Sequence, residues 1–218
     1  MMSRTLVIGN KAYSSWSLRP WIAMKQIGLA LDEIVIAMAM PETKANMLAH
    51  APTGKVPVLK DGDVVVWETL AILEYLNETY ANGALWPQDR AARAHARALA
   101  NEMHAGFAAL RNHCPMNVRR RPEPYALTPE VMKDVARIEA MWTEARQRYG
   151  QGGPFLFGAF SNADAMFAPV VNRLHDYLIP VSPVVRTYID AMRALPAMQE
   201  WNAAAAREPW VIADSERY

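Results

Sequence analysis

The pattern of the chain changes once, between residues 82 and 90. Residues 1–82 mix strand patterns with helical ones, whereas residues 90–206 have helical spacing almost throughout. The stretch between them, residues 83–89, carries Gly83 and Pro87, which is typical of a linker. We therefore expect an α/β domain over residues 1–82, a linker over 83–89 and an all-helical domain over 90–218.

The first domain is predicted to have the element order βαβαββα. Strands are expected over 5–8, 33–38, 58–60 and 64–67, and helices over 17–28, 44–50 and 69–80. Asp61-Gly62 is a strong signal for a hairpin between the last two strands. A crossover helix makes the first two strands parallel, and the hairpin makes the last two antiparallel. Pro20 is expected in the first turn of its helix, where a missing N–H does no harm.

The second domain is predicted to contain only helices. They are expected over 90–118, 129–149, 162–177, 183–194 and 196–206. Thr128 and Pro129 suit the N-cap and first position of one of them. The segment from Ser161 to Asp164 resembles a capping box in which aspartate takes the place of glutamate.

Charge and composition exclude several classes of protein. The 218 residues carry 23 basic and 22 acidic side chains, so there is no large field of one sign for nucleic acid or an anionic membrane. No apolar run reaches the roughly 18 residues of a membrane span. With one cysteine, Cys114, no intrachain disulfide can form, which suits a reducing, cytoplasmic location. Neither motif nor spacing indicates a metal site.

The loop from Tyr13 to Ser15 stands where the first helix begins. Unpaired N–H groups and the positive end of the helix dipole stabilise an anion at such a position. A thiolate held there would have a lowered pKa, and a serine hydroxyl could donate a hydrogen bond to its sulfur. On spacing alone, these serines fit the role of helix caps equally well.

Two further segments join this loop if the domain folds as expected. A cis bond between Val56 and Pro57 would turn the Val56 backbone outward to pair with a peptide, although an ordinary trans proline is the more frequent case. Glu68 can accept from an ammonium group, and Thr69 can hold a carboxylate at the next helix N-terminus. Taken alone, that pair also fits a threonine cap beside a solvated glutamate.

Together these segments resemble the cytosolic glutathione transferase family along the whole chain. Four motifs carry the resemblance: Ser14-Ser15-Trp16-Ser17-Leu18-Arg19, Gly54-Lys55-Val56-Pro57-Val58-Leu59, Glu68-Thr69 and Ser161-Asn162-Ala163-Asp164. The first is similar to the serine motifs of the zeta and tau classes. The resemblance implies a thioredoxin-like N-terminal domain followed by an all-α domain, and a homodimer with glutathione as co-substrate.

The resemblance also implies a role for each matching residue. Ser14 would be the catalytic serine that stabilises the glutathione thiolate. Glutathione would be bound by Ser14, Ser15, Lys55, Val56, Pro57, Glu68 and Thr69. The implied activity is detoxifying conjugation of glutathione to small, mostly apolar electrophiles, with peroxide reduction as a further activity. A zeta-type cis–trans isomerase and a non-catalytic glutathione-binding module remain alternatives.

Some positions depart from the zeta pattern. Trp16 stands where that class has cysteine. Asp176 matches the position of an arginine that serves the maleylacetoacetate substrate, and Arg173 lies one turn earlier. The displacement of this arginine counts against the isomerase alternative.

The pocket for the second substrate is expected on the helix predicted over 90–118. His104, Phe107 and Arg111 are its candidate residues, although helical positions of this kind more often have structural roles. Cys114 lies outside the serine loop and is expected to be a buried, unreactive thiol.

Overall fold

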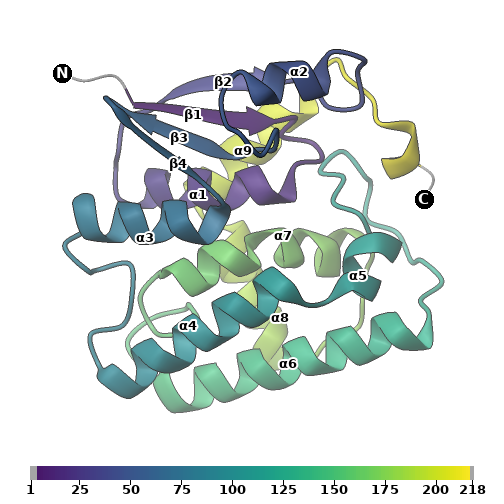
Figure 1. Cartoon of the computed structure of the whole chain (residues 1–218). Helices are drawn as coiled ribbons and strands as arrows, with labels where there is room; N and C mark the ends of the chain where they lie inside the picture. The colour runs from purple at the N-terminus through teal and green to yellow at the C-terminus, as the bar shows by residue number, and fades with distance from the viewer. Residues whose placement is uncertain (1–3, 217–218) are drawn as a thin grey trace.

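The short strands of the first half form one mixed sheet. The computed structural model describes residues 4–216, and the sheet has the order β2-β1-β3-β4. The elements of this half are β1 (Arg4–Gly9), α1 (Ser15–Gln26), β2 (Asp32–Ile36), α2 (Thr43–Leu48), β3 (Val58–Asp61), β4 (Val64–Trp67) and α3 (Thr69–Thr79). β1 is parallel to β2 and antiparallel to β3. Helices α1 and α3 cover one face of the sheet and α2 lies on the other (Figure 1).

The second half is helical, which confirms the predicted fold class. It contains α4 (Arg90–Ala105), α5 (Ala108–His113), α6 (Pro129–Tyr149), α7 (Asn162–Asp176), α8 (Pro183–Arg193), α9 (Pro196–Ala206) and the short helix η1 (Ala213–Ser215). Helix α9 packs beside α1, and the last described residues lie at the side of the molecule, where Tyr13 in the loop after β1 donates to Glu216 (Figure 1). No helix between residues 4 and 216 has both the length and the apolar character needed to cross a membrane.

The hairpin between β3 and β4 is one residue tighter than predicted. Asp61 pairs with Val64, so the turn consists of Gly62 and Asp63. Gly62 has a φ of 58°, in the left-handed region that glycine adopts without a steric penalty. The turn residues therefore fix the register of both strands, as the sequence suggested.

The predicted helix over 90–118 is wrong, because the chain breaks between α4 and α5. Gly106 is extended, with φ −106° and ψ −167°, and Phe107 is left-handed, with φ 60° and ψ 39°. A Cβ atom on Gly106 would lie 2.8 Å from the backbone oxygen of Glu102. Glycine is therefore required at this break. Gly106 indicated the break in the sequence, but the helical spacing of the residues around it favoured one continuous helix.

Helix α1 begins at Ser15, two residues before the predicted start. Pro20 consequently lies in the second turn, where its missing N–H deprives the Trp16 carbonyl of a helical donor. The Thr69 hydroxyl donates to this carbonyl instead, with an oxygen–oxygen distance of 3.3 Å. Proline thus opens a backbone acceptor in α1 that joins it to the first residue of α3.

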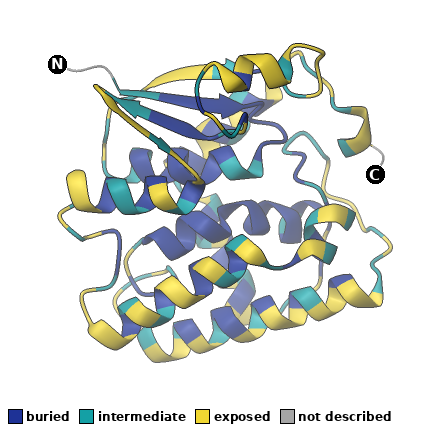
Figure 2. Ribbon diagram, in the orientation of Figure 1, coloured by how far each residue is buried: buried dark blue, intermediate teal, exposed yellow. Residues whose placement is uncertain are grey.

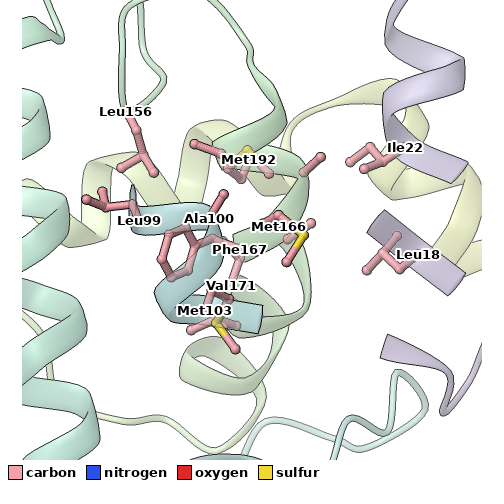
Figure 3. Packing of buried hydrophobic residues seen from close by; sticks show 14 of the residues in the cluster. Leu18, Ile22, Leu99, Ala100, Met103, Leu156, Met166, Phe167, Val171 and Met192 are labelled. Atoms are coloured by element: carbon pink, nitrogen blue, oxygen red, sulfur yellow. The ribbon is translucent and has the colours of Figure 1, made fainter. Parts of the chain in front are cut away.

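The main hydrophobic core crosses the predicted domain boundary. Figure 3 shows Leu18 and Ile22 of α1 facing Met166 of α7, with Met103 of α4 nearby. Buried residues concentrate along β1, α1 and α7, whereas α6 exposes one side to solvent (Figure 2). α3 ends and α4 begins on either side of the predicted linker, but the division into 1–82, 83–89 and 90–218 stays a prediction.

The capping box at the start of α7 is present and fully buried. Asp164 is 0% exposed, and its carboxylate accepts from the N–H groups of Leu156 at 3.0 Å and Ser161 at 2.8 Å. The Ser161 hydroxyl donates to the same carboxylate at 2.8 Å. Burial raises the pKa of Asp164 to about 6, against the lowering effect of these hydrogen bonds. One side chain therefore holds both the helix start and the preceding loop.

Candidate functional site

A cavity of about 400 Å³ lies where the α/β half meets the helices. Its walls come from α1, the loop before β3, the start of α3, and the two helices α4 and α5. The lining residues are Trp16, Thr53, Lys55, Val56, Pro57, Glu68, Thr69, His104 and Arg111. Seven of the predicted site residues are in this set: Lys55, Val56, Pro57, Glu68, Thr69, His104 and Arg111.

The Val56–Pro57 segment borders the cavity next to the sheet. Its peptide bond is cis, which is the less frequent of the two alternatives that the sequence left open. The paired part of the sheet begins at Val58, which faces Val7 and Trp67, so Val56 lies beyond the ladder. The Val56 backbone is thus placed at the cavity without a strand partner on β1 or β4.

Glu68 joins β4 to α3 in an unusual backbone conformation. Its φ of 68° and ψ of 127° are rare for a residue with a side chain. The side chain is exposed and lines the cavity. Sparsely populated backbone conformations are retained most often at functional sites, because other contacts must offset a cost of about 1–3 kcal/mol.

Thr69, the first residue of α3, has two polar groups with different partners. Its hydroxyl donates to the Trp16 carbonyl at 3.3 Å, so its single proton is already engaged. Its backbone N–H lies in the first turn of α3, where helices have no internal acceptor to offer. The part of Thr69 that suits a carboxylate ligand is therefore its backbone N–H.

Ser14 is the N-cap of α1 and lies beside the cavity, not among its lining residues. It is 6% exposed, and its Oγ is 2.7 Å from the Oγ of Ser17. The Gly9 N–H donates to Ser17 Oγ at 3.1 Å. If Ser17 donates onward to Ser14, the Ser14 proton stays available for a ligand. Ser15 is the first residue of α1 and is half-buried.

Ser17 was not among the predicted site residues. Its place in the motif gave a weak signal, since residues three apart in a helix lie on the same face. The three-residue spacing from Ser14 could have suggested this contact.

The loop before Ser14 is held by the far end of the chain. The Glu208 carboxylate accepts from the Lys11 N–H at 2.7 Å and the Ala12 N–H at 2.9 Å. Trp201 donates through its indole N–H to the Lys11 carbonyl at 2.9 Å. Almost 200 residues separate these partners, so no local sequence pattern could have revealed them. Glu208 therefore fixes the backbone that leads into Ser14.

Replacing Glu208 by alanine is expected to loosen this loop. Two backbone donors would lose a charged acceptor, so the free energy of unfolding should fall by about 2 kcal/mol, as measured by urea denaturation. Amide hydrogen exchange should accelerate at Lys11 and Ala12. Glu200→Ala is the matched control, because Glu200 forms only an exposed ion pair with Lys25. Equal stability of the two variants would contradict this role.

Phe107 differs from the other two predicted pocket residues. It is 7% exposed and belongs to the main hydrophobic core, outside the lining set. The break after Gly106 turns its side chain away from the helical face on which the sequence placed it. His104 and Arg111, on either side of the break, both line the cavity.

Cys114 is fully buried, as predicted. Burial raises the pKa of its thiol to about 11, although nearby arginines act in the opposite direction. The protonated thiol is a poor nucleophile, so burial and the raised pKa both disfavour reaction of Cys114 at neutral pH. Between residues 4 and 216, no group of three or more His, Cys, Asp or Glu side chains is arranged to hold a metal ion.

Comparison with known proteins assigns both halves of the chain to one family. Residues 13–79 match the model of the glutathione S-transferase N-terminal domain, and residues 88–204 match that of the glutathione S-transferase C-terminal domain. A probable maleylacetoacetate isomerase of Caenorhabditis elegans is 25% identical, covering 81% of this chain and 88% of its own. Glutathione S-transferase Z2 of Arabidopsis thaliana is 26% identical, covering 91% and 92%.

The solved structures agree in fold. The theta class glutathione S-transferase of Xanthomonas axonopodis pv. citri, with glutathione bound, superposes with a TM-score of 0.69 and 25% identity. The alignment covers 92% of this chain and 97% of that one. Most of the described fold is thus shared with that transferase.

Proposed function

Because this chain belongs to the glutathione S-transferase family, we propose that its cavity binds glutathione and transfers the thiolate to a small electrophile. One observation carries the proposal: the cavity brings together the Val56–Pro57 segment, the Glu68–Thr69 pair and the first turn of α1. The Val56–Pro57 segment can pair with a peptide backbone, and the Glu68–Thr69 pair can bind the charged end of an amino acid. The N-terminus of α1 can stabilise an anion. Glutathione presents all three.

In the proposed complex, glutathione lies along the sheet edge. Its γ-glutamyl ammonium group meets the Glu68 carboxylate, and the adjoining carboxylate meets the Thr69 N–H. The cysteinyl backbone pairs with Val56, next to Pro57. Lys55, which is exposed at the rim, pairs with the glycyl carboxylate. This arrangement directs the sulfur towards the N-terminus of α1, with Ser14 and Ser15.

The proposed chemistry needs a stabilised thiolate and a positioned acceptor. The glutathione thiol loses its proton to solvent, and the sulfur anion is stabilised by the Ser14 hydroxyl and the helix N-terminus. The sulfur then forms a bond to the electrophilic carbon, and the leaving group departs with its electron pair. Orientation and fixed dipoles supply the rate enhancement.

The proposal is tested by titrating glutathione into the protein in a calorimeter. A second measurement follows thiolate absorbance of bound glutathione against pH. Binding at millimolar or lower concentration, with a thiol pKa below that of free glutathione, supports the proposal. Binding with an unchanged thiol pKa would instead favour a non-catalytic binding module, and absence of binding would refute the proposal.

Glu68→Gln is expected to weaken glutathione binding selectively. The amide has the shape of the carboxylate but lacks its charge, so the ammonium contact weakens and KM for glutathione should rise at least about tenfold. kcat should change little, since Glu68 lies away from the sulfur. Glu78→Gln, on the exposed side of the same helix, is the matched control. A fall in kcat with constant KM would contradict this assignment.

Glutathione-dependent isomerisation is the second candidate, favoured by the isomerase that matches most of this chain at 25% identity. In that reaction the sulfur adds to the substrate and is expelled after bond rotation, so glutathione is not consumed. Arg173, the arginine one turn before the position where the zeta class has its substrate arginine, does not line the cavity. It is 4% exposed and donates to the Cys114 carbonyl at 2.8 Å. Turnover of maleylacetone without consumption of glutathione would select this candidate.

A homodimer is proposed on the same family basis. The edge strand β4 exposes Val64, Val65 and Trp67 by 44%, 41% and 40% of their surfaces. Apolar side chains on an unpaired edge are usually covered by a partner. Sedimentation equilibrium tests this: a monomer at micromolar concentration would refute it. Cytoplasmic location and a role in detoxification likewise remain proposals.

A further inference from the structure

The inner wall of the cavity is cationic. Trp16, His104 and Arg111 form it, and the Arg111 guanidinium carbon is 4.8 Å from the centre of the Trp16 ring. Arg19 is one turn beyond Trp16 on α1, and its guanidinium carbon is 4.0 Å from the same ring. The His104 ring meets Trp16 edge-on at 5.2 Å. Two guanidinium groups and an imidazole therefore surround one indole that faces the cavity.

Several polar atoms in this wall, or packed against it, have no hydrogen-bond partner within the described chain. Arg19 is 0% exposed, yet neither of its Nη atoms has a hydrogen-bond acceptor, and only its Nε is bonded, to the Met166 carbonyl at 2.9 Å. His104 Nδ1 is likewise buried and unpaired. Arg111 has one long contact, from Nη1 to the Gly106 carbonyl at 3.4 Å. Buried groups of this kind normally have hydrogen-bond partners, and of these residues His104 and Arg111 line the cavity, where a ligand can supply one.

The positive charge of this region is also uncompensated. Among residues 4–216, no ion pair involves Arg19, Arg111 or Arg173. Burial lowers the pKa of Arg19, and the charges of Arg173 and Arg111 lower it further. Burial also lowers the pKa of Arg173 to about 10, with a further contribution from Arg111. Three guanidinium groups thus act on one another without a carboxylate between them, which is unfavourable until an anion binds.

We propose that the second substrate of this protein carries a carboxylate, which Arg111 binds at the Trp16–His104 wall of the cavity. This inference rests on the proposed transfer function and narrows its substrate class from apolar electrophiles to anionic ones. Arg111 is the direct ligand, because it lines the cavity and is half-buried. Arg19 and Arg173 are buried outside the lining set and add to the positive potential. Trp16 offers an apolar ring surface for the remainder of the substrate.

A matched pair of probes tests this inference. Chloronitrobenzoate, with its chlorine para to the carboxylate and next to the nitro group, reacts with the thiolate by forming a carbon–sulfur bond and releasing chloride. Its methyl ester undergoes the same reaction without the charge. The two glutathione conjugates, prepared chemically, are titrated into the protein in a calorimeter, so the comparison does not depend on turnover. The acid conjugate is expected to bind at least about tenfold more tightly than the ester conjugate.

Variants identify the residue responsible. Arg111→Met is expected to reduce the preference for the acid conjugate to about one, and Arg111→Lys should retain part of it, because charge remains while the planar fork is lost. Arg148→Met is the matched control: Arg148 forms an exposed ion pair with Glu144 on α6, and the preference should be unchanged. Circular dichroism spectra verify that each variant is folded.

Three outcomes would overturn the inference. They are equal affinity of the parent protein for both conjugates, a preference that survives in Arg111→Met, and a loss of affinity for glutathione alone in that variant with the preference intact. The last outcome would show that Arg111 binds glutathione and not the carboxylate of the second substrate. Binding of glutathione without any preference defeats only this inference, whereas no binding of glutathione defeats the proposed function as well.

Discussion

Ser14→Ala is expected to lower kcat/KM for glutathione conjugation by about 100- to 1,000-fold, the usual effect of removing one preorganised donor from a developing anion. The proposed role of the Ser14 hydroxyl is to donate to the glutathione sulfur, which would otherwise rely on the N-terminus of α1 alone. The protein should remain folded, because the Ser14 side chain makes no capping hydrogen bond to the backbone of α1.

The neighbouring hydroxyl explains why this donor is well oriented. The Gly9 N–H occupies one acceptor position of Ser17, and Ser17 lies 2.7 Å from Ser14. If Ser17 donates to Ser14, the chain of donors from Gly9 through Ser17 leaves the Ser14 proton available for a ligand, and each bond polarises the next. Ser17→Ala should therefore also reduce activity, by about tenfold, since Ser14 keeps its hydroxyl but loses its orientation.

The measurement is the pH dependence of kcat/KM together with the thiolate absorbance of bound glutathione. In Ser14→Ala the pKa of the bound thiol should rise towards that of free glutathione, whereas a purely structural defect would leave it unchanged. Ser15→Ala is the control from the same loop. If Ser15→Ala abolishes activity and Ser14→Ala does not, the catalytic assignment moves to Ser15.

The largest loss of stability is expected for Asp164→Ala. The variant would leave the N–H groups of Leu156 and Ser161 and the Ser161 hydroxyl without an acceptor in a fully buried place. Three unsatisfied buried donors should lower the free energy of unfolding by about 4 kcal/mol. For a chain of this size, that loss corresponds to a fall in Tm of roughly 8–16 °C. Thermal unfolding followed by circular dichroism measures it.

Two controls separate the capping box from general effects. Ser161→Ala removes one of the three donors and keeps the carboxylate, so the free energy of unfolding should fall by only about 1 kcal/mol. Asp190→Ala, at an exposed position of α8, should change stability by less than about 0.5 kcal/mol. If Asp164→Ala were as stable as Asp190→Ala, the capping box would not be holding α7.

The local part of the fold could be predicted because its signals are local. Gly62 fixes the hairpin, Thr128 caps α6 through the Val131 N–H, and the Ser161–Asp164 box starts α7. Each depends on the backbone preference or capping capacity of a few adjacent residues. The wrong prediction of one helix over 90–118 also has a local cause. A single glycine within a long helical pattern is often tolerated, so the pattern around Gly106 favoured an unbroken helix.

The predicted site residues likewise depend on whether the elements that carry them were predicted correctly. Val56, Pro57, Glu68 and Thr69 stand beside element boundaries that the pattern already located, and the structure brings them to one cavity. Phe107 was misjudged because its place on a helical face depended on a helix that does not continue.

Sequence alone determined the order of the elements in the first half, the serine loop at the start of the first helix and the family to which the motifs point. Tertiary structure alone decided that Glu208 holds the loop before Ser14, that Thr69 bonds the carbonyl freed by Pro20, and that Arg19 and Arg111 flank one tryptophan. The physical reason is distance along the chain. Periodicity and capping act between neighbouring residues, whereas these contacts join segments that meet only after the whole core has packed.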